Sequence, residues 1–411
     1  MNIALLGFGT VGQGVWKLLQ ERKDLLDQAL GEPMNIVGIG VRTLGKKRAV
    51  SAPEELFTTD AETLVSREDV DCLVEVTGDQ EMASRLMKQA LLSGKSVVTA
   101  NKAAVAADFE ELSRAAQDGG ASFRFEAAVC GGIPIVAPLI AQAALNEIET
   151  IRGIVNGSSN YVLTELAKGK ALEEVLGEAR RLGVLEADPT DDLAGYDAQR
   201  KIAILASLVS GHALSLDQIP CLGIETLDAQ DMAWMRSAHR MIRLIASFEG
   251  HGGRQSAFVC PVALPESDGL ALVQGLDNQV EVQGSRVGHL VFRGPGAGMD
   301  PTANAVWTDL LSVSRSRWSP AVHSASEAGG ELSAKEEPDA SEAEWYYVRL
   351  RTAEESDPWS DLRSSLSANV PDGETMEKLG ALPDHAGFMR LSLREAEMLY
   401  QRGAVVLKWG M

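Results

Sequence analysis

The first third of the chain alternates short apolar runs with longer segments in which apolar residues recur at helical spacing. Residues 2–6 predict a buried strand, residues 11–30 a helix and residues 35–41 a second strand. The alternation predicts further strands and helices at residues 72–76, 82–92, 96–99, 109–117 and 123–126. Strands separated by helices in this way are typical of an α/β fold with a doubly wound parallel sheet.

The middle of the chain follows a different pattern. Residues 146–155 predict one strand, which runs into a small polar loop near residue 156. Residues 251–293 alternate apolar and polar positions between turn glycines, as strands and a hairpin do. We therefore expect an α+β domain here, followed by a loop and a helix over residues 294–313 that return to the first domain.

The last part of the chain changes composition twice. Residues 315–344 are rich in Ser, Ala, Glu and Gly, which predicts a flexible linker. Alternation resumes at residues 345–351, and residues 388–393 and 404–409 predict further strands of a small α+β domain. The predicted domains are residues 1–133, completed by a helix near 299–314, then 134–298, the linker 315–344, and 345–411.

Composition narrows the class of protein. With 411 residues and 45% hydrophobic content, the chain is expected to be a globular protein of two or three domains. Its net charge of −20 argues against nucleic acid or an anionic membrane as partner. Four scattered cysteines without a CxxC pair fit reduced thiols in the cytoplasm. Met1 leads directly into the first strand, so we expect no targeting peptide, and no apolar run is long enough for a membrane span.

A glycine motif follows the first strand at once. Gly7, Gly9 and Gly12 form GxGxxG, in which the glycines allow a tight turn, close approach to a pyrophosphate and close packing of helix on strand. The phosphates would lie at the helix N-terminus, where free N–H groups favour anions. This context indicates a Rossmann-type dinucleotide site, although a purely structural glycine turn remains the alternative. The candidate cofactor-binding residues are Gly7, Gly9, Thr10, Val11 and Gly12.

Basic residues after the second strand indicate which dinucleotide is bound. Enzymes that use NAD usually end this strand with Asp or Glu, which binds the ribose 2′-hydroxyl. Here the strand ends at Val41 and Arg42, and Lys46, Lys47 and Arg48 follow. Such a cluster suits a 2′-phosphate, so Arg42 and Lys46 predict NADP, with NAD possible; the alternative is a basic surface loop.

Two later strand ends point toward the same cofactor. In open parallel sheets, ligands bind beyond the carboxyl ends of the strands, which is where Thr77 and Lys102 fall. We therefore expect both in the cofactor cleft, although Lys102 could also be a solvent-exposed loop lysine.

An acidic segment over residues 186–201 offers acid–base chemistry. Its carboxylates precede a single lysine, Lys201, and are Glu186, Asp188, Asp191, Asp192 and Asp197. Since residues 202–209 predict a helix, Asp197 and Lys201 lie one turn apart, where each can tune the pKa of the other. The remaining acids could bind a substrate ammonium group. The alternative is a surface turn with an Asp N-cap and a solvated ion pair.

Taken together, the motifs resemble those of homoserine dehydrogenases. The match spans roughly residues 1–314, and its blocks occur in the family's order: residues 7–12, 100–102, 125–135, 156–164, 186–201 and 294–303. The resemblance implies NADP-preferring, reversible interconversion of L-homoserine and L-aspartate 4-semialdehyde in threonine, methionine and isoleucine biosynthesis. It also implies a homodimer or homotetramer, with residues 134–298 as the substrate-binding and dimerisation domain.

The resemblance implies roles for individual residues. Lys201 corresponds to the acid/base residue, Asp197 to its partner and a substrate contact, and Lys102 to a lysine beside the nicotinamide and substrate. Further implied contacts with the substrate are Glu186, Asp192 and Gly183. Gly298 corresponds to a glycine that returns to the cofactor. Glu126, with the carbonyls of Val129, Gly131 and Ile133, corresponds to a monovalent cation site (Na⁺ or K⁺) at the domain junction.

The sequence also departs from the family. Gly78-Asp79 replaces the usual Gly-Gly and adds an acid near the cofactor. Cys130 admits a second hypothesis, an aldehyde dehydrogenase with a thiol nucleophile, although an inert buried thiol explains it too. Residues 345–411 resemble an ACT-type regulatory domain, but Trp359 stands where its effector turn normally has glycine, so we expect weak threonine inhibition or none. A catalytically retired, dinucleotide-binding regulatory relative is the remaining alternative.

Overall fold

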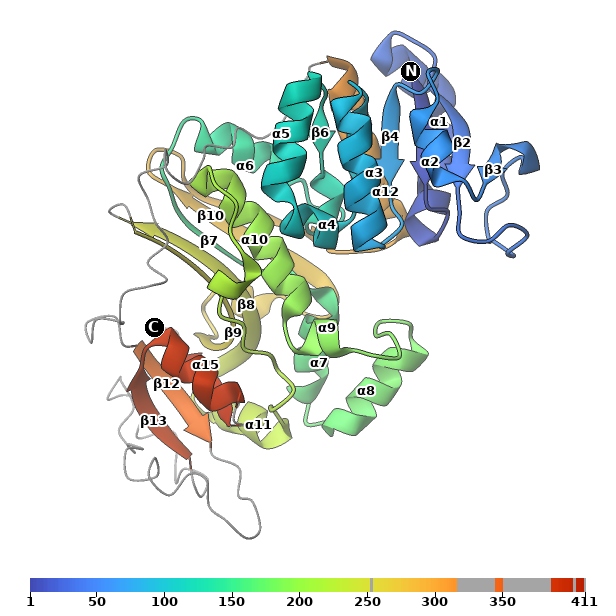
Figure 1. Ribbon diagram of the computed structural model, residues 1–411. Helices are drawn as coiled ribbons and strands as arrows, with labels where there is room; N and C mark the ends of the chain where they lie inside the picture. Colours follow the sequence, from blue (N-terminus) through green and yellow to red (C-terminus); the bar gives the residue numbers. More distant parts are fainter. Residues whose placement is uncertain (252–253, 316–343, 350–385, 402–403, 410–411) are drawn as a thin grey trace. The chain divides into compact units, whose positions relative to one another are not determined.

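The computed structural model describes residues 1–251, 254–315, 344–349, 386–401 and 404–409 (Figure 1). The chain divides into two compact units. The first comprises Met1–Glu149, Ala203–Leu216 and Val282–Glu331. The second comprises Thr150–Ile202, Asp217–Glu281 and Leu332–Met411.

A parallel sheet of six strands forms the centre of the first unit, in the order β3-β2-β1-β4-β5-β6. Its strands are β1 (Asn2–Leu6), β2 (Asn35–Gly40), β3 (Phe57–Thr58), β4 (Cys72–Glu75), β5 (Ser96–Thr99) and β6 (Phe123–Arg124). The order reverses direction between β1 and β4, as in doubly wound folds that bind a ligand at this point. The predicted α/β class is confirmed, and the last strand ends at Arg124 because Glu126–Ala128 form a 3₁₀ turn.

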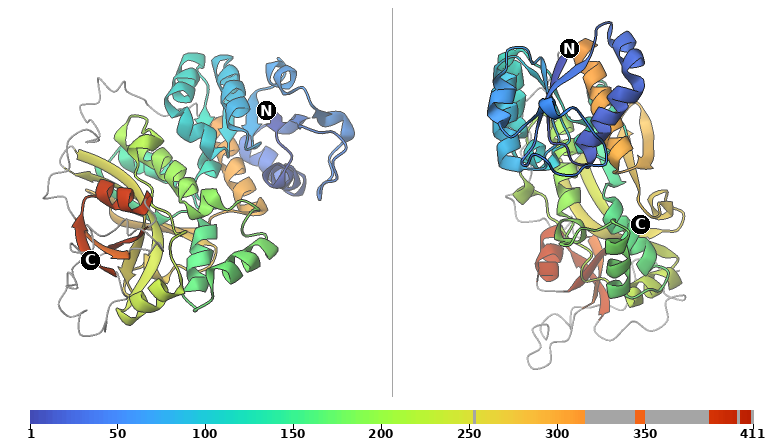
Figure 2. Two further views of the ribbon diagram at one scale, coloured as in Figure 1. Left: turned by 60° about the horizontal axis from the view of Figure 1, so that its bottom comes forward. Right: turned by 90° about the vertical axis from the view of Figure 1, so that its right-hand side faces the viewer.

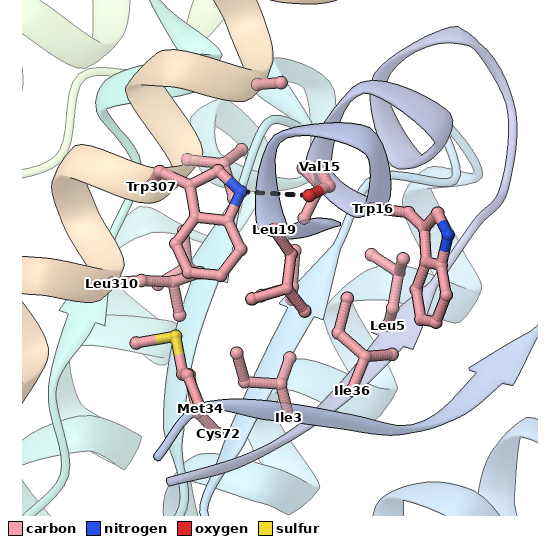
Figure 3. Packing of buried hydrophobic residues seen from close by; sticks show 14 of the residues in the cluster. Ile3, Leu5, Val15, Trp16, Leu19, Met34, Ile36, Cys72, Trp307 and Leu310 are labelled. Atoms are coloured by element: carbon pink, nitrogen blue, oxygen red, sulfur yellow. Dashed lines mark hydrogen bonds between the residues drawn. The ribbon is translucent and has the colours of Figure 1, made fainter. Parts of the chain in front are cut away.

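Helices cover both faces of this sheet (Figure 2). They are α1 (Thr10–Leu30), α2 (Ala61–Ser66), α3 (Gln80–Leu92), α4 (Lys102–Ala107), α5 (Phe109–Gly119) and α12 (Met299–Arg315), while α6 (Val136–Ala143) follows the sheet. Helix α12 packs on α1, where the Trp307 indole N–H donates to the Val15 carbonyl at 3.0 Å (Figure 3). Ile3, Leu5 and Leu19 are buried in the same core. The segment expected to return to the first domain is therefore a helix packed on the glycine-motif helix.

The second sheet has eight strands in the order β11-β10-β7-β8-β9-β14-β12-β13. They are β7 (Ile148–Ile154), β8 (Arg240–His251), β9 (Arg254–Pro265), β10 (Asp277–Gly284), β11 (Gly288–Pro295), β12 (Glu344–Arg349), β13 (Ala386–Leu391) and β14 (Val405–Trp409). The strands predicted over residues 251–293 begin earlier than expected, with β8 at Arg240. The three C-terminal strands, β12, β13 and β14, occur close to where alternation predicted them. The predicted linker and the turn at Trp359 lie outside the described residues.

Among the described residues, six further helices lie between the strands of this sheet in sequence, and α10 among them extends from the second unit into residues of the first. They are α7 (Gly157–Leu166), α8 (Leu172–Arg181), α9 (Thr190–Leu193), α10 (Tyr196–Ser210), α11 (Ala229–Ser237) and α15 (Leu393–Gln401). The polar stretch after β7, expected as a loop, is the start of α7, because the Asn156 side chain caps it by accepting the Ser159 N–H at 2.7 Å. None of the helices in the described ranges is long and apolar enough to span a bilayer.

Candidate active site

A cavity of about 750 Å³ opens beyond the carboxyl ends of β1, β2 and β4 in the first unit. Five of the predicted cofactor residues line it: Gly7, Gly9, Arg42, Lys46 and Thr77. Gly7 has φ +99°, and a Cβ there would lie 2.7 Å from the Val76 carbonyl oxygen. A Cβ on Gly12 would overlap the Gly7 carbonyl, whereas the space above Gly9 is open. The first and third glycines therefore permit the fold, and the second leaves room for a ligand.

The cavity is positive on the side after β2. Arg42, Lys46 and Arg48 line it, whereas Lys47 does not. Arg48, to which the sequence assigned no role of its own, lies with its guanidinium carbon 4.7 Å from the Phe57 ring centroid. It also donates to the Thr43 carbonyl at 3.2 Å. Stacking on Phe57 and hydrogen bonding to Thr43 hold the Arg48 guanidinium in one place. The sequence alone could not indicate these contacts.

Glu75, at the end of β4, is a buried carboxylate that the sequence did not single out. Its Oε1 accepts the Thr77 N–H at 2.7 Å and the Thr77 hydroxyl at 2.6 Å, while its Oε2 accepts the Thr99 hydroxyl at 2.8 Å. Burial raises the pKa of Glu75 above its ordinary value. Glu75 thus ties the cavity-lining turn at Thr77 to the end of β5.

Lys102 begins α4, and Asn101 caps that helix by accepting the Ala104 N–H at 3.1 Å. Asp79 both lines the cavity and caps α3, which explains the acid that replaces the family's second glycine. The lining does not include Thr10, Val11, Gly12, Lys102 or Gly298. Gly298 precedes α12 with φ +125°, a conformation that favours glycine.

A second cluster, in the second unit, joins Lys201 to two carboxylates. Lys201 Nζ lies 2.7 Å from Asp197 Oδ2 and donates to the Val155 carbonyl at 2.7 Å. The Asn156 side-chain amide donates to Asp192 Oδ1 at 2.7 Å and to Asp197 Oδ2 at 2.8 Å. The Lys201 and Asp197 side chains are only 11% and 8% exposed, so this is not a solvated surface pair. Asn156 is a site residue whose role the sequence did not indicate.

The other acids of the segment do not join this cluster. Asp191 pairs with Arg200 at 2.7 Å, and Asp188 accepts the Thr190 N–H at 3.1 Å. Glu186 is exposed, and within the described ranges it forms no hydrogen bond or ion pair. Gly183 is also exposed, with φ +71°. The helix spacing correctly paired Asp197 with Lys201, but it could not distinguish which of the other acids turn inward.

Glu126 is buried against the N-terminus of α6. Its carboxylate accepts the N–H groups of Ile135 and Val136, both at 2.7 Å, and of Ala137 at 2.9 Å. Burial raises the pKa of Glu126 despite these donors. In this part of the described chain, backbone N–H groups reach the carbonyls of Glu126 and Cys130 but not those of Val129, Gly131 or Ile133.

Cys130 is fully buried and has φ +55°. A thiol without solvent access is poorly placed to attack a substrate carbonyl. The described geometry therefore favours an inert thiol over the aldehyde dehydrogenase hypothesis.

Comparison with known proteins identifies the family. A model described as "Homoserine dehydrogenase, NAD binding domain" matches residues 7–126, and one described as "Homoserine dehydrogenase" matches residues 134–311. The homoserine dehydrogenase of Corynebacterium glutamicum is 43% identical over 323 residues, which cover 77% of this chain and 72% of that protein. The chain belongs to the homoserine dehydrogenase family. It is an NAD(P)-dependent oxidoreductase acting on a CH–OH group.

Solved homoserine dehydrogenases have the same fold. The enzyme from Thiobacillus denitrificans is 33% identical with a TM-score of 0.79, and the match covers 96% of this chain and 98% of that one. A hyperthermophilic archaeal homoserine dehydrogenase, solved in complex with NADPH, is 28% identical with a TM-score of 0.64 and covers 78% of this chain and 99% of its own. The family resemblance seen in the sequence is confirmed.

Proposed function

We propose that this homoserine dehydrogenase interconverts L-homoserine and L-aspartate 4-semialdehyde, with NADP as its preferred cofactor. The observation that carries the proposal is the cluster of buried Lys201, Asp197 and Asn156 with half-buried Asp192. NADP, when bound, supplies or accepts the hydride. The protein must then provide a proton at the reacting oxygen and a site for the substrate's ammonium group.

Lys201 is the proton donor and acceptor of this proposal. Reduction of the semialdehyde carbonyl builds negative charge on its oxygen, which a nearby ammonium both stabilises and protonates. Asp197 and the Val155 carbonyl fix the direction of the Lys201 amine. Lys102, at the start of α4, is assigned to the cofactor side of the same reaction.

Asp192 and Asp197 are assigned to the substrate's ammonium group. Their negative charge is held in place by the Asn156 amide, which donates to both. Glu186 and Gly183 remain predicted substrate contacts. Since both are exposed in the described structure, their role would require the loop between α8 and α9 to contact bound substrate.

Three cations support the preference for NADP. Arg42, Lys46 and Arg48 line the cavity after β2, where the ribose 2′-phosphate binds in related folds. The archaeal relative solved with NADPH gives independent support.

We also propose that Glu126 and the carbonyls of Val129, Gly131 and Ile133 bind a monovalent cation. The donor set is all oxygen, as Na⁺ and K⁺ require, and these carbonyls receive no backbone N–H within the described ranges. Glu126 Oε2 accepts only one backbone N–H and so keeps a lone pair for a cation, whereas Oε1 already accepts two.

The remaining expectations concern the whole protein. We propose that it acts in the cytoplasm as a homodimer or homotetramer. We further propose that residues 345–411 form an ACT-like domain that serves mainly in assembly and responds weakly or not at all to threonine.

The proposal is tested by following NADPH absorbance with homoserine or the semialdehyde as substrate. Lys201→Ala should reduce turnover by about 10²–10⁴-fold while NADP still binds, because proton transfer is lost and the cofactor cavity is intact. Arg200→Ala removes a neighbouring cation of α10 and serves as the control. Near-normal turnover in Lys201→Ala would remove Lys201 from the mechanism and leave Lys102 as the acid/base.

A further inference from the structure

The junction between α9 and α10 separates the two substrate carboxylates. Leu193, Ala194 and Gly195 connect Asp192 to the helix that carries Asp197. Any displacement of these three residues would therefore change the distance between the carboxylates that Asn156 joins. The contacts that hold this junction in place therefore help to set the distance between Asp192 and Asp197.

A second segment, residues 219–225, contacts this junction through backbone and side-chain hydrogen bonds. The Ile224 N–H donates to the Leu193 carbonyl at 2.7 Å, and the Cys221 thiol donates to the Ala194 carbonyl at 3.2 Å. A Cβ on Gly223 would overlap the Leu193 carbonyl. At Gly223 the two backbones are thus in direct contact, and no side chain there can absorb a shift.

The supporting segment is in turn held by the C-terminal helix α15. Tyr400 donates its hydroxyl to Glu225 Oε2 at 2.5 Å, and Glu397 Oε1 accepts the Cys221 N–H at 3.2 Å. Tyr400 and Glu225 are 175 positions apart in the sequence, and Glu397 and Cys221 are 176 positions apart.

The helix itself is firmly packed. Ala396 and Leu399 are buried in the same core as Leu222, from the supporting segment, and Ile154, at the end of the strand that precedes Asn156. Tyr400 packs on the edge of this core. Helix α15 therefore shares one hydrophobic core with the supporting segment and with the strand that precedes Asn156.

We propose that Tyr400 and Glu397 are positioning residues for the substrate carboxylates, acting through residues 219–225 on the α9–α10 junction. The proposal rests on the function proposed above, since it takes Asp192 and Asp197 to bind homoserine. It makes the C-terminal element a structural part of the substrate site as well as a region for assembly.

The test compares KM for homoserine with KM for NADP in full-length variants. Tyr400→Phe removes one hydroxyl, and Glu397→Ala removes one acceptor; each should raise KM for homoserine by about three- to tenfold and leave KM for NADP unchanged. Glu397→Gln retains an oxygen that can accept the Cys221 N–H, so it should restore most of the wild-type value. Met398→Ala, at an exposed position of the same helix, is the matched control.

The outcomes separate the two proposals. If wild-type enzyme does not use homoserine, the proposed function fails. If wild type is active but Tyr400→Phe and Glu397→Ala keep its KM for homoserine, the inference is wrong. Equal rises in both KM values, or the same effect in Glu397→Gln as in Glu397→Ala, would indicate general loosening and would also overturn it. Thermal melting of each variant establishes that it is folded.

Discussion

At the scale of single residues, the most consequential side chain is Asn156. Its Oδ1 caps α7, while its Nδ2 joins Asp192 to Asp197. Asp197 is buried and Asp192 is half-buried, and two such carboxylates that approach one another repel unless donors neutralise them. Asn156 and Lys201 supply those donors, so one amide both begins a helix and organises the proposed substrate site.

Replacing Asn156 separates these two tasks. Asn156→Asp can still cap α7, but it loses the bridging amide and adds a third negative charge. We expect kcat/KM for homoserine to fall by about tenfold to a hundredfold, and the melting temperature to fall because a third carboxylate would meet Asp192 and Asp197 at a largely buried position. Asn156→Ala should show the same kinetic loss and also about 1 kcal/mol of destabilisation from the lost cap. Steady-state kinetics and thermal melts of both variants would check this; unchanged kinetics in Asn156→Asp would refute the bridging role.

Arg42 carries the prediction about cofactor choice. Arg42→Asp replaces a cation that attracts phosphate by an acid suited to a ribose hydroxyl. A charge-assisted hydrogen bond is worth about 1.5–3 kcal/mol, so the NADP/NAD ratio of kcat/KM should fall by roughly tenfold to a hundredfold. Lys47→Asp makes a charge change of the same sign outside the cavity lining and is the control. If both variants shift the ratio equally, the effect comes from overall charge and not from a phosphate site.

At the scale of elements, the ends of strands β4 and β5 are joined by the buried carboxyl group of Glu75. Glu75 accepts hydrogen bonds from Thr77, which lines the cofactor cavity, and from Thr99. Hydrogen bonds to Glu75 therefore connect the turn after β4 to the end of β5. This connection is electrostatic, so it depends on pH.

Glu75 should make the stability of the first unit fall as pH rises. Burial raises its pKa in the folded state, so the unfolded chain ionises first when pH increases, which stabilises the unfolded state. The loss begins near the ordinary pKa of a glutamate and continues up to the raised value. Glu75→Gln does not titrate, so the advantage of wild type over this variant should shrink between low and neutral pH. Urea midpoints of both proteins from acid to neutral pH test this; an advantage that grows with pH would contradict it.

At the scale of the whole molecule, the described C-terminal elements belong to the second unit's sheet and core. Strand β14 pairs in parallel with β9, Lys408 opposite Val262, and β12 pairs antiparallel with both β14 and β13. Tyr346 and Val348 are buried in one core with Ile245 and Phe258. In the part of the chain that the structure describes, the C-terminal elements are therefore integral to the sheet and core of the second unit.

A chain ending at Val313 should accordingly be unstable. It would expose the edge of β9 and the apolar side chains now covered by β12, β14 and α15, and unpaired edges promote aggregation. We expect aggregates in size-exclusion chromatography and a lowered melting temperature. A monodisperse truncated chain with the full-length KM for homoserine would disprove this. Threonine sensitivity is therefore better tested on full-length protein.

The sequence by itself determined the features that depend on local order. Strand–helix alternation predicted the parallel sheet, the glycine spacing predicted its ligand turn, and the one-turn spacing of Asp197 and Lys201 predicted their ion pair. Each of these is set by residues within a few positions of one another, where backbone geometry and side-chain period leave few choices. The family blocks were recognisable for the same reason.

The tertiary structure alone decided which distant residues meet. Asn156 reaches Asp192 and Asp197 across 36 and 41 positions, and Glu75 reaches Thr99 across 24. Nothing local distinguishes Asp192, which contributes to the cluster, from Asp191, which pairs with Arg200. The pairing of β14 with β9 is of the same kind, because sheet neighbours are chosen by the packing of whole elements. Local patterns specify the elements, and burial of their apolar faces specifies which polar side chains are brought together.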